Sequence, residues 1–240
     1  ASDPLQAWAI SDKLHKEGRW PMVDLQLATQ QQARAMPNDT LIAQQWHLKF
    51  QNQANVVAGT DVNIENAWRY GTTGGVKGTG IRVGIIDDGM QTTHPDFENN
   101  VDDLIDKDWN SNDNDPNPGT ANHHGTSCAG NVAARGNNNR GVCGTAPEAI
   151  LVGLRLTAGS STDQMEAEAM AHRNDVIFVK NNSWGPTDDG LTLEEPGALT
   201  KAAFANATTS GRNNLGTIFL WAAGNGGYTN NENDNSNYDG

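Results

Sequence analysis

Three polar residues, Asp87, His124 and Asn225, lie where short apolar runs end or where a segment of small residues begins. Together, side chains of these types could catalyse hydrolysis. Asp87 follows the apolar run 81–86, His124 precedes a Gly-Thr pair and a row of small residues, and Asn225 follows the apolar run 219–223. A carboxylate, an imidazole and an amide are the orienting group, the general base and an oxyanion donor of a serine-hydrolase site. Each residue alone has a plain alternative, as a turn aspartate, a core histidine or a left-handed turn residue. The prediction therefore depends on their joint occurrence.

Alternating strands and helices must position these residues. The sequence predicts strands at 81–86, 149–156, 175–181 and 216–223, and helices that begin near Gly125, Asp163 and Gly197. Such alternation is typical of an α/β domain with a mostly parallel sheet covered on both faces. In such domains the site lies at the carboxyl ends of the strands. An apolar run broken by two carboxylates and a glycine, as at 81–89, fits a buried strand that ends at a site.

The first 37 residues differ from the rest and are predicted to be an extension of unknown role. They contain a helix candidate around 5–10 and a Gln/Ala-rich stretch, 26–35, with good helix propensity. Residues 38–240 form one domain in this prediction, with Asp61 as the N-cap of a short helix that includes Trp68. The chain lacks the features of a signal peptide at its N-terminus and of a membrane span, so we expect a processed chain.

Composition narrows the possible partners. The 240 residues carry a formal net charge of −13, and the mean hydropathy is −0.63. This charge argues against nucleic-acid binding and suits cationic substrates, calcium or simply solubility. The only cysteines are Cys128 and Cys143, so disulfides do not build the fold, and Cys128 is predicted to be buried and free.

Four motifs occurring in order carry a resemblance to a known family. They are Asp87-Asp88-Gly89, His124-Gly125-Thr126, the segment 182–186 (Asn-Ser-Trp-Gly-Pro) and the segment 224–227 (Gly-Asn-Gly-Gly). From about residue 38 to residue 240 the chain resembles the kexin/furin branch of the subtilisin-like serine proteases, in a bacterial form. The resemblance implies an α/β, three-layer subtilisin-like fold that is incomplete at the C-terminus of this chain.

The resemblance also implies roles for the catalytic candidates. Asp87 would orient the imidazole, His124 would be the general base and Asn225 would donate to the oxyanion. The family's nucleophilic serine lies in a later segment that the printed sequence does not contain, and a partner for Cys143 would lie there too. Ser127 is not a substitute, because on the same helical turn as His124 its hydroxyl would lie near its own backbone.

The family cleaves after Lys or Arg at basic pairs, which implies acids in the substrate pockets. Asp188 and Asp239 match the first pocket, with Trp184 and Gly185 in the adjoining segment, Asp88 matches the second, and Glu166 and Glu194 match the fourth. Where the family has a further acid before the histidine, this chain has Ala121 and Asn122, so we expect relaxed selection before the cut. Glu166 is also compatible with a solvated helix face.

Calcium is the cofactor that the resemblance implies. A first site would use Asp39, Asp96, Asn139 and the backbone carbonyls of Arg135, Val142 and Gly144, a second would use Asp188 with Asp234, and a third would use Asp108, Asp113 and Asp115. Oxygen-rich loops suit this hard cation. The third stretch is not an EF-hand, because glycine and glutamate are missing at the required positions, and it could be a plain acidic turn. Adjacent His123 and His124 do not support a zinc site, because neighbouring side chains diverge.

Together these observations predict a secreted, calcium-dependent serine endopeptidase made as a zymogen, with its nucleophile outside the printed chain. Its partners would be polypeptides with Lys or Arg at the cleavage site, the remainder of its own protease domain, and a propeptide, chaperone or protein inhibitor. Nucleic acid and membrane spans are not expected. The alternatives are a subtilase of broad specificity and a catalytically inactive fragment that binds calcium or an inhibitor.

Overall fold

The computed structural model describes residues 4–18, 36–70, 75–186 and 195–225. The chain divides into two units, 1–35 and 36–240. In the first unit, α1 (Pro4–Lys16) includes the helix candidate at 5–10, whereas the candidate at 26–35 lies outside the described residues. None of the described helices has the length and apolar character needed to cross a membrane.

A five-stranded sheet forms the centre of the second unit, in the order β2-β3-β1-β4-β5. Its strands are β1 (Arg82–Asp87), β2 (Lys107–Asp108), β3 (Ile150–Arg155), β4 (Val179–Asn182) and β5 (Ile218–Trp221), and every pairing is parallel. The predicted α/β class with a parallel sheet is confirmed. The two-residue strand β2 was not predicted, because it lies in a segment rich in turn residues.

One strand boundary differs from the prediction by more than two residues. Strand β4 starts at Val179 instead of 175, because a turn at Arg173, which has a φ of 46°, comes first. The backbone amides of Val176 and Ile177 both donate to the Arg173 carbonyl, and this turn delays the entry of the chain into the sheet.

The three helices predicted to begin near Gly125, Asp163 and Gly197 begin within one residue of those positions. The helices of the second unit are α2 (Ile64–Arg69), α3 (His124–Ala133), α4 (Asp163–Ala171) and α5 (Ala198–Asn214), with short 3-10 turns at Ile42–Gln44 and Pro95–Phe97. The predicted N-cap of α2 is wrong. Asn63 occupies that position, while the Asp61 carboxylate accepts hydrogen bonds from the backbone amides of Phe50 and Asn63.

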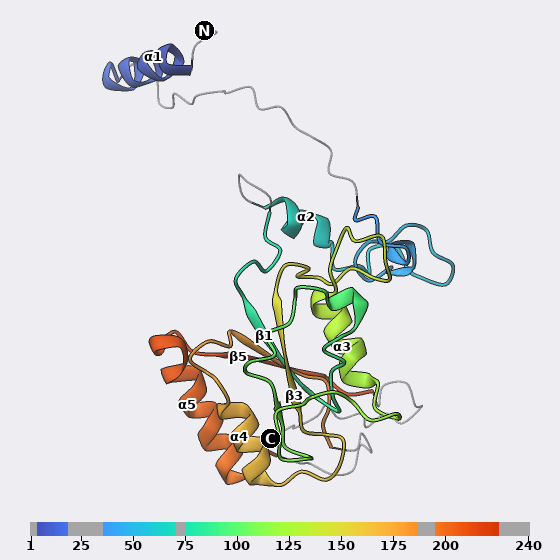
Figure 1. Cartoon of the computed structure of the whole chain (residues 1–240). Helices are drawn as coiled ribbons and strands as arrows, with labels where there is room; N and C mark the ends of the chain where they lie inside the picture. The colour runs from blue at the N-terminus through green and yellow to red at the C-terminus, as the bar shows by residue number, and fades with distance from the viewer. Residues whose placement is uncertain (1–3, 19–35, 71–74, 187–194, 226–240) are drawn as a thin grey trace. The chain divides into compact units, whose positions relative to one another are not determined.

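Helices cover both faces of the sheet, with α3 on one side and α4 beside α5 on the other (Figure 1). Successive β1 side chains alternate between the layers, as a strand requires. Ile85 packs in the cluster that contains Ala129 and Ala133 of α3, and Ile86 packs in the cluster that contains Ala169 and Met170 of α4. The result is three layers with an apolar core on each face of the sheet.

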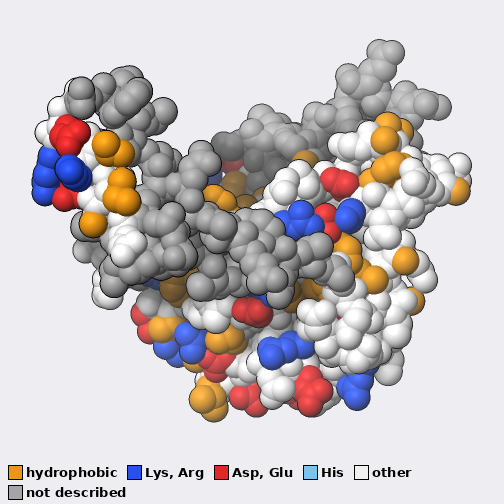
Figure 2. Space-filling view, turned by 90° about the horizontal axis from the view of Figure 1, so that it is seen from above, with side chains coloured by type: hydrophobic (Ala, Val, Ile, Leu, Met, Phe, Trp, Pro, Cys, Tyr) orange, Lys and Arg blue, Asp and Glu red, His pale blue; other side chains and the backbone are white. Residues whose placement is uncertain are grey.

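The strand register brings the predicted site elements to one edge. Ile86 of β1 lies opposite Asn182 of β4, which lies opposite Trp221 of β5. The residues that follow these three positions therefore leave the sheet side by side at its carboxyl edge. On the described surface, side chains of both charges are interspersed (Figure 2).

Candidate catalytic site

Asp87 and His124 meet at the carboxyl edge of the sheet. Asp87 is the last residue of β1 and its side chain is 2% exposed, whereas the side chain of His124, the first residue of α3, is 58% exposed. The two carboxylate oxygens lie 2.9 and 3.1 Å from His124 Nδ1. The start of α3 approaches this closely because residue 125 is glycine, where a Cβ would collide with Asp87 and with the Gly89 carbonyl.

Electrostatics in this pair suit a general base. The hydrogen bond with Asp87 raises the pKa of His124, an effect that burial partly opposes. Burial raises the pKa of Asp87, while its hydrogen bonds with His124 and with the Asp88 backbone amide oppose the rise. With Nδ1–H donated to the carboxylate, the tautomer leaves a lone pair on Nε2 that can accept a proton.

Asp88, the predicted acid of the second substrate pocket, has a structural task. Its two carboxylate oxygens accept hydrogen bonds from the backbone amides of His124 and Gly125, at 3.2 and 2.7 Å. These amides are orphan donors at the first turn of α3, where a negative charge is also favoured by the helix dipole. Asp88 therefore holds the helix that carries the histidine.

Ser127 and Cys128 follow on α3 and differ in their relation to the base. The Ser127 hydroxyl donates to the His123 carbonyl at 3.0 Å, so it faces its own helix as expected. Cys128 is free but only half-buried, which corrects the prediction of a buried thiol. Its Sγ lies 3.8 Å from Nδ1 and 3.9 Å from Nε2 of His124. The four-residue spacing on a helix, which places two side chains on one face, could have revealed this contact from the sequence.

Cys128 does not have the properties of a nucleophile in this arrangement. Its sulfur is nearly equidistant from both ring nitrogens, so it is not in line with the lone pair of either one. Burial raises the pKa of Cys128, which works against the reactive thiolate even though a hydrogen bond with Ser183 lowers it.

Some of the remaining predicted site residues lie within the described part of the chain and others lie outside it. Trp184 and Gly185 follow β4, and the Trp221 indole of β5 donates to the Trp184 carbonyl at 2.7 Å while the two rings pack edge to face. Asn225 is exposed beyond the end of β5, at the same edge of the sheet as Asp87. Glu166 on α4 accepts a hydrogen bond from Ser161. Asp188, Glu194, Asp234 and Asp239 lie outside the described residues.

The first predicted calcium loop contains two buried carboxylates. Asp39 and Asp96 are 2% and 3% exposed. Asp39 accepts hydrogen bonds from the backbone amides of Asn137 and Asn138, and Asp96 accepts from the Asn138 side chain and the Val142 amide. Neither acid takes part in an ion pair with any described residue. Two buried carboxylates beside one loop, with no cationic side chain paired to them among the described residues, fit a hard cation with oxygen ligands.

The other residues predicted for this site surround the same loop. The Arg135 amide donates to the Asp96 carbonyl, the Gly144 amide donates to the Ala134 carbonyl, and the exposed Asn139 donates its own amide to Asn38. Cys143 is fully buried here, and burial together with the charges of Asp39 and Asp96 raises its pKa to about 12.

The third predicted calcium site is organised around an arginine. Asp108 is 1% exposed, and its carboxylate lies 2.6 Å from the Arg155 guanidinium and accepts from the amides of Asn110 and Ser111. Asp113 and Asp115 are exposed, Asp113 forms an isolated antiparallel bridge with Asp108, and its carboxylate accepts a hydrogen bond from the Asp115 amide. The guanidinium already supplies the positive charge that a cation would bring to Asp108.

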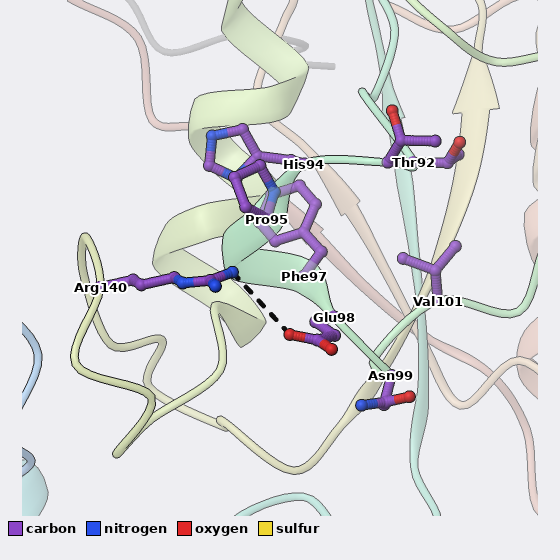
Figure 3. A pocket seen from close by; sticks show the side chains of 9 residues that line it. Thr92, His94, Pro95, Phe97, Glu98, Asn99, Val101 and Arg140 are labelled. Atoms are coloured by element: carbon purple, nitrogen blue, oxygen red, sulfur yellow. Dashed lines mark ion pairs between the residues drawn. The ribbon is translucent and has the colours of Figure 1, made fainter.

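A cavity of about 440 Å³ lies beside the loop 135–144, which contributes Arg140 to its lining (Figure 3). Glu98 and Arg140 point toward each other across it, 3.9 Å apart and both well exposed. An exposed pair of this kind contributes little to stability. None of the residues that line the cavity bonds to Asp87 or His124, so it is not the catalytic site.

Comparison with known proteins agrees with this geometry. Residues 78–240 match the model of the subtilase family, Peptidase S8. The chain belongs to this family. It is 43% identical over 210 residues to the PC3-like endoprotease variant B of Hydra vulgaris, covering 85% of this chain and 28% of that protein. It is 37% identical over 239 residues to the proprotein convertase subtilisin/kexin type 4 of Mus musculus, covering 97% of this chain and 34% of that protein.

A solved structure of the same family supports the subtilisin-like fold. The serine protease of Aeromonas sobria, crystallised as a complex with its chaperone, matches with a TM-score of 0.67 and 29% identity over 80% of this chain and 33% of that chain. The predicted fold class is confirmed. This subtilase chain spans between about a quarter and a third of the length of these relatives.

Proposed function

We propose that this subtilase is a secreted, calcium-dependent serine endopeptidase that is made as a zymogen and cleaves after Lys or Arg, preferably at basic pairs. The observation that carries the proposal is the pairing of a buried Asp87 with an exposed His124 at the sheet edge. Relatives named as furin-like proteases and proprotein convertases support the substrate class. The nucleophilic serine would lie in polypeptide beyond the printed sequence, of which this chain would be the N-terminal part in a bacterial-type enzyme.

The reaction would be acyl transfer at a peptide bond. His124 Nε2 takes the proton of the serine hydroxyl as it attacks the scissile carbonyl, and later gives it to the leaving amine. Asp87 stays ionised, holds Nδ1–H and stabilises the imidazolium that forms. The Asn225 side-chain amide donates to the oxyanion, an interaction worth about 3 kcal/mol in the transition state.

Specificity would come from carboxylates around the substrate. A formal charge of −13 attracts basic peptides, and Asp188, Glu194 and Asp239 remain the proposed pocket acids, with Glu166 on α4. Both carboxylate oxygens of Asp88 already accept hydrogen bonds from backbone amides in the first turn of α3. Asp88 would therefore bind a cationic side chain of the substrate more weakly than a free carboxylate would. We expect strict selection at the cut and relaxed selection before it.

Calcium would stabilise the fold without taking part in the chemistry. Asp39 and Asp96, with Asn139 and the carbonyls of Arg135, Val142 and Gly144, would hold one ion, and Asp188 with Asp234 would hold another. The bound ion neutralises buried charge and fixes the loop. A chaperone or propeptide partner is proposed by analogy with the Aeromonas sobria protease, which was crystallised with a chaperone.

The test uses purified protein that includes the polypeptide proposed to carry the serine, and three fluorogenic peptides that differ only before the cut: Arg-Arg, Ala-Arg and Ala-Phe. We expect Arg-Arg and Ala-Arg to be cleaved at rates within tenfold of each other, Ala-Phe at least a hundredfold more slowly, and both activities to be lost with calcium chelator. His124→Ala is the control for contaminating protease. Equal cleavage of all three peptides would establish the broad-specificity alternative. If the protein binds calcium but neither cleaves the peptides nor reacts with a serine-directed fluorophosphonate, the inactive-fragment alternative is established.

A further inference from the structure

Gln45 is a buried polar residue that joins the segment following Asp39 to the loop 135–144. It is 5% exposed and comes directly after the 3-10 turn Ile42–Gln44. Its side-chain Nε2 donates to the Cys143 carbonyl at 2.9 Å, and its Oε1 accepts from the Cys143 amide at 2.8 Å. One side chain therefore pairs with both backbone groups of a fully buried residue that is 98 positions away in the sequence.

The hydrogen bond from the Cys143 amide fixes the direction of the Val142 carbonyl. In a trans peptide unit, the carbonyl of one residue and the amide N–H of the next point in opposite directions. All peptide bonds of the described residues are trans. Because the Cys143 amide points at Gln45, the Val142 carbonyl points away from Gln45. No described residue donates a hydrogen bond to that carbonyl, so it is available to a cation.

The preceding peptide unit is held from both ends. The Val142 amide donates to the Asp96 carboxylate at 2.8 Å, and the Gly141 carbonyl of the same unit accepts from the Leu41 amide at 2.8 Å. These bonds keep the loop beside Asp96, but they do not act on the peptide unit that contains the Val142 carbonyl. Among the described side chains, only Gln45 is hydrogen-bonded to that unit.

We infer that Gln45 is a positioning residue for calcium, which holds the Val142 carbonyl in the direction of the ion that Asp39 and Asp96 would bind. Backbone carbonyls are ordinary ligands of Ca²⁺, and a ligand that is already fixed loses less conformational freedom when the ion binds. Partners that orient metal ligands typically contribute about 10–100-fold to metal affinity. This inference rests on the calcium site of the proposed function.

Calcium affinity is measured through Tb³⁺, which occupies oxygen-lined calcium sites and emits light when a nearby tryptophan is excited. Trp68 packs in the same cluster as Cys143, and its indole donates to the Thr145 carbonyl at 2.9 Å, so it can sensitise an ion bound by this loop. The protein used includes the polypeptide proposed to carry the serine. The part of the emission that is absent in Asp39→Asn belongs to this site, and its displacement by Ca²⁺ gives the calcium Kd.

Three variants separate positioning from general stabilisation. Gln45→Met is similar in size but loses both hydrogen bonds, and we expect its calcium Kd to rise at least tenfold. Gln45→Glu keeps an acceptor for the Cys143 amide, so its calcium Kd should stay within about threefold of the wild type. Gln53→Met is the matched control, because the exposed Gln53 bonds to the Ala43 carbonyl and the Gln51 amide and not to the loop 135–144. Its calcium Kd should stay within about twofold of the wild type.

Urea unfolding in the presence of a chelator measures the stability of the calcium-free proteins. If Gln45→Met lowers this stability but leaves the calcium Kd within about twofold of the wild type, Gln45 is only structural and the inference is overturned. Gln45→Asn, whose amide is one methylene too short to reach both Cys143 groups, gives the same test if Gln45→Met folds poorly, and its Kd should rise at least fivefold. A wild type without an Asp39-dependent Tb³⁺ signal rejects the proposed calcium site together with the inference. A normal wild-type signal with an unchanged Kd in the Gln45 variants rejects the role of Gln45 alone.

Discussion

The acids of β1 and β2 lie in the same register but meet different partners. Asp87 of β1 and Asp108 of β2 are both opposite Arg155 of the intervening strand β3, and both are almost fully buried. Asp87 pairs with the exposed imidazole of His124, whereas Asp108 pairs with a guanidinium whose side chain is 15% exposed. A buried acid can support proton transfer only where its partner titrates near neutral pH and reaches solvent. Of these two acids, only Asp87 has such a partner, the His124 imidazole.

A second acid beside each pair extends the comparison. Asp88 caps α3 with both oxygens, so its charge is compensated by backbone amides. Asp106 is 4% exposed and accepts one hydrogen bond from the Gly153 amide, while its other oxygen has no hydrogen-bond partner among the described residues. Burial raises the pKa of Asp106 to about 7, and the charges of Asp102, Asp103 and Asp115 add to the rise. Ionising Asp106 in the folded state therefore costs free energy.

The largest effect is expected for Asp87→Asn, which removes the charge behind the general base. By the behaviour of such triads kcat should fall about 10⁴-fold with little change in folding. Because the pairing raises the pKa of His124, the residual activity should also extend to lower pH than in the wild type. Rates on the Arg-Arg peptide across pH 5–9 check both points. A fall below tenfold would show that the β1 pair is structural, like the β2 pair.

Asp106→Asn should stabilise the protein at and above neutral pH. The folded pKa of about 7 exceeds the usual value of 3.8, so the folded state binds more protons than the unfolded state between these two values, and wild-type stability decreases as pH rises through them. Removing the charge recovers up to about 4 kcal/mol above pH 7 and almost nothing below pH 4. Denaturant unfolding at pH 4 and pH 8 measures this. The exposed neighbour Asp103→Asn is the control for net charge, and an equal gain there would contradict the assignment to burial.

Arg155→Met should destabilise the fold by about 3 kcal/mol, because it leaves Asp108 buried without its cation. Burial raises the pKa of Asp108, but hydrogen bonds from Ser111 and Arg155 outweigh that effect and hold the pKa below its usual value. The stabilisation from the pair is therefore present above pH 3.8 and is lost as pH falls through the folded pKa. Urea unfolding at pH 7 checks the loss, with the exposed Arg140→Met expected to stay within about 0.5 kcal/mol of the wild type.

The smallest effect is expected for Asp88→Ala, which removes the cap of α3. Loss of an N-terminal cap costs about 1 kcal/mol, and here it also loosens the helix turn that carries His124. We expect a small drop in thermal stability and a fall in kcat well below that of Asp87→Asn. If kcat falls while stability stays unchanged, Asp88 contacts substrate and the capping role is secondary.

The sequence predicted the elements that build the site better than the contacts within it. An apolar run broken by Asp87 and a histidine before small residues are local patterns, so the end of β1 and the start of α3 could be placed. The Asp88 cap and the Arg155 bridge join segments that are distant in the sequence, so local patterns do not contain them. The two-residue strand β2 gives almost no periodicity, and it exists because β3 provides its hydrogen bonds.

By itself, the sequence determined the α/β class, the order of the four longer strands and the helices between them, and the identity of the residues at the sheet edge, because hydrophobic periodicity and turn residues act over short distances. Only the tertiary structure decided what each acid does. Asp87, Asp88, Asp106 and Asp108 are the same residue type in similar surroundings of sequence. Burial and the nearest partner give them four different roles. Asp87 pairs with an imidazole, Asp88 with two helix amides, Asp106 with one amide and Asp108 with a guanidinium.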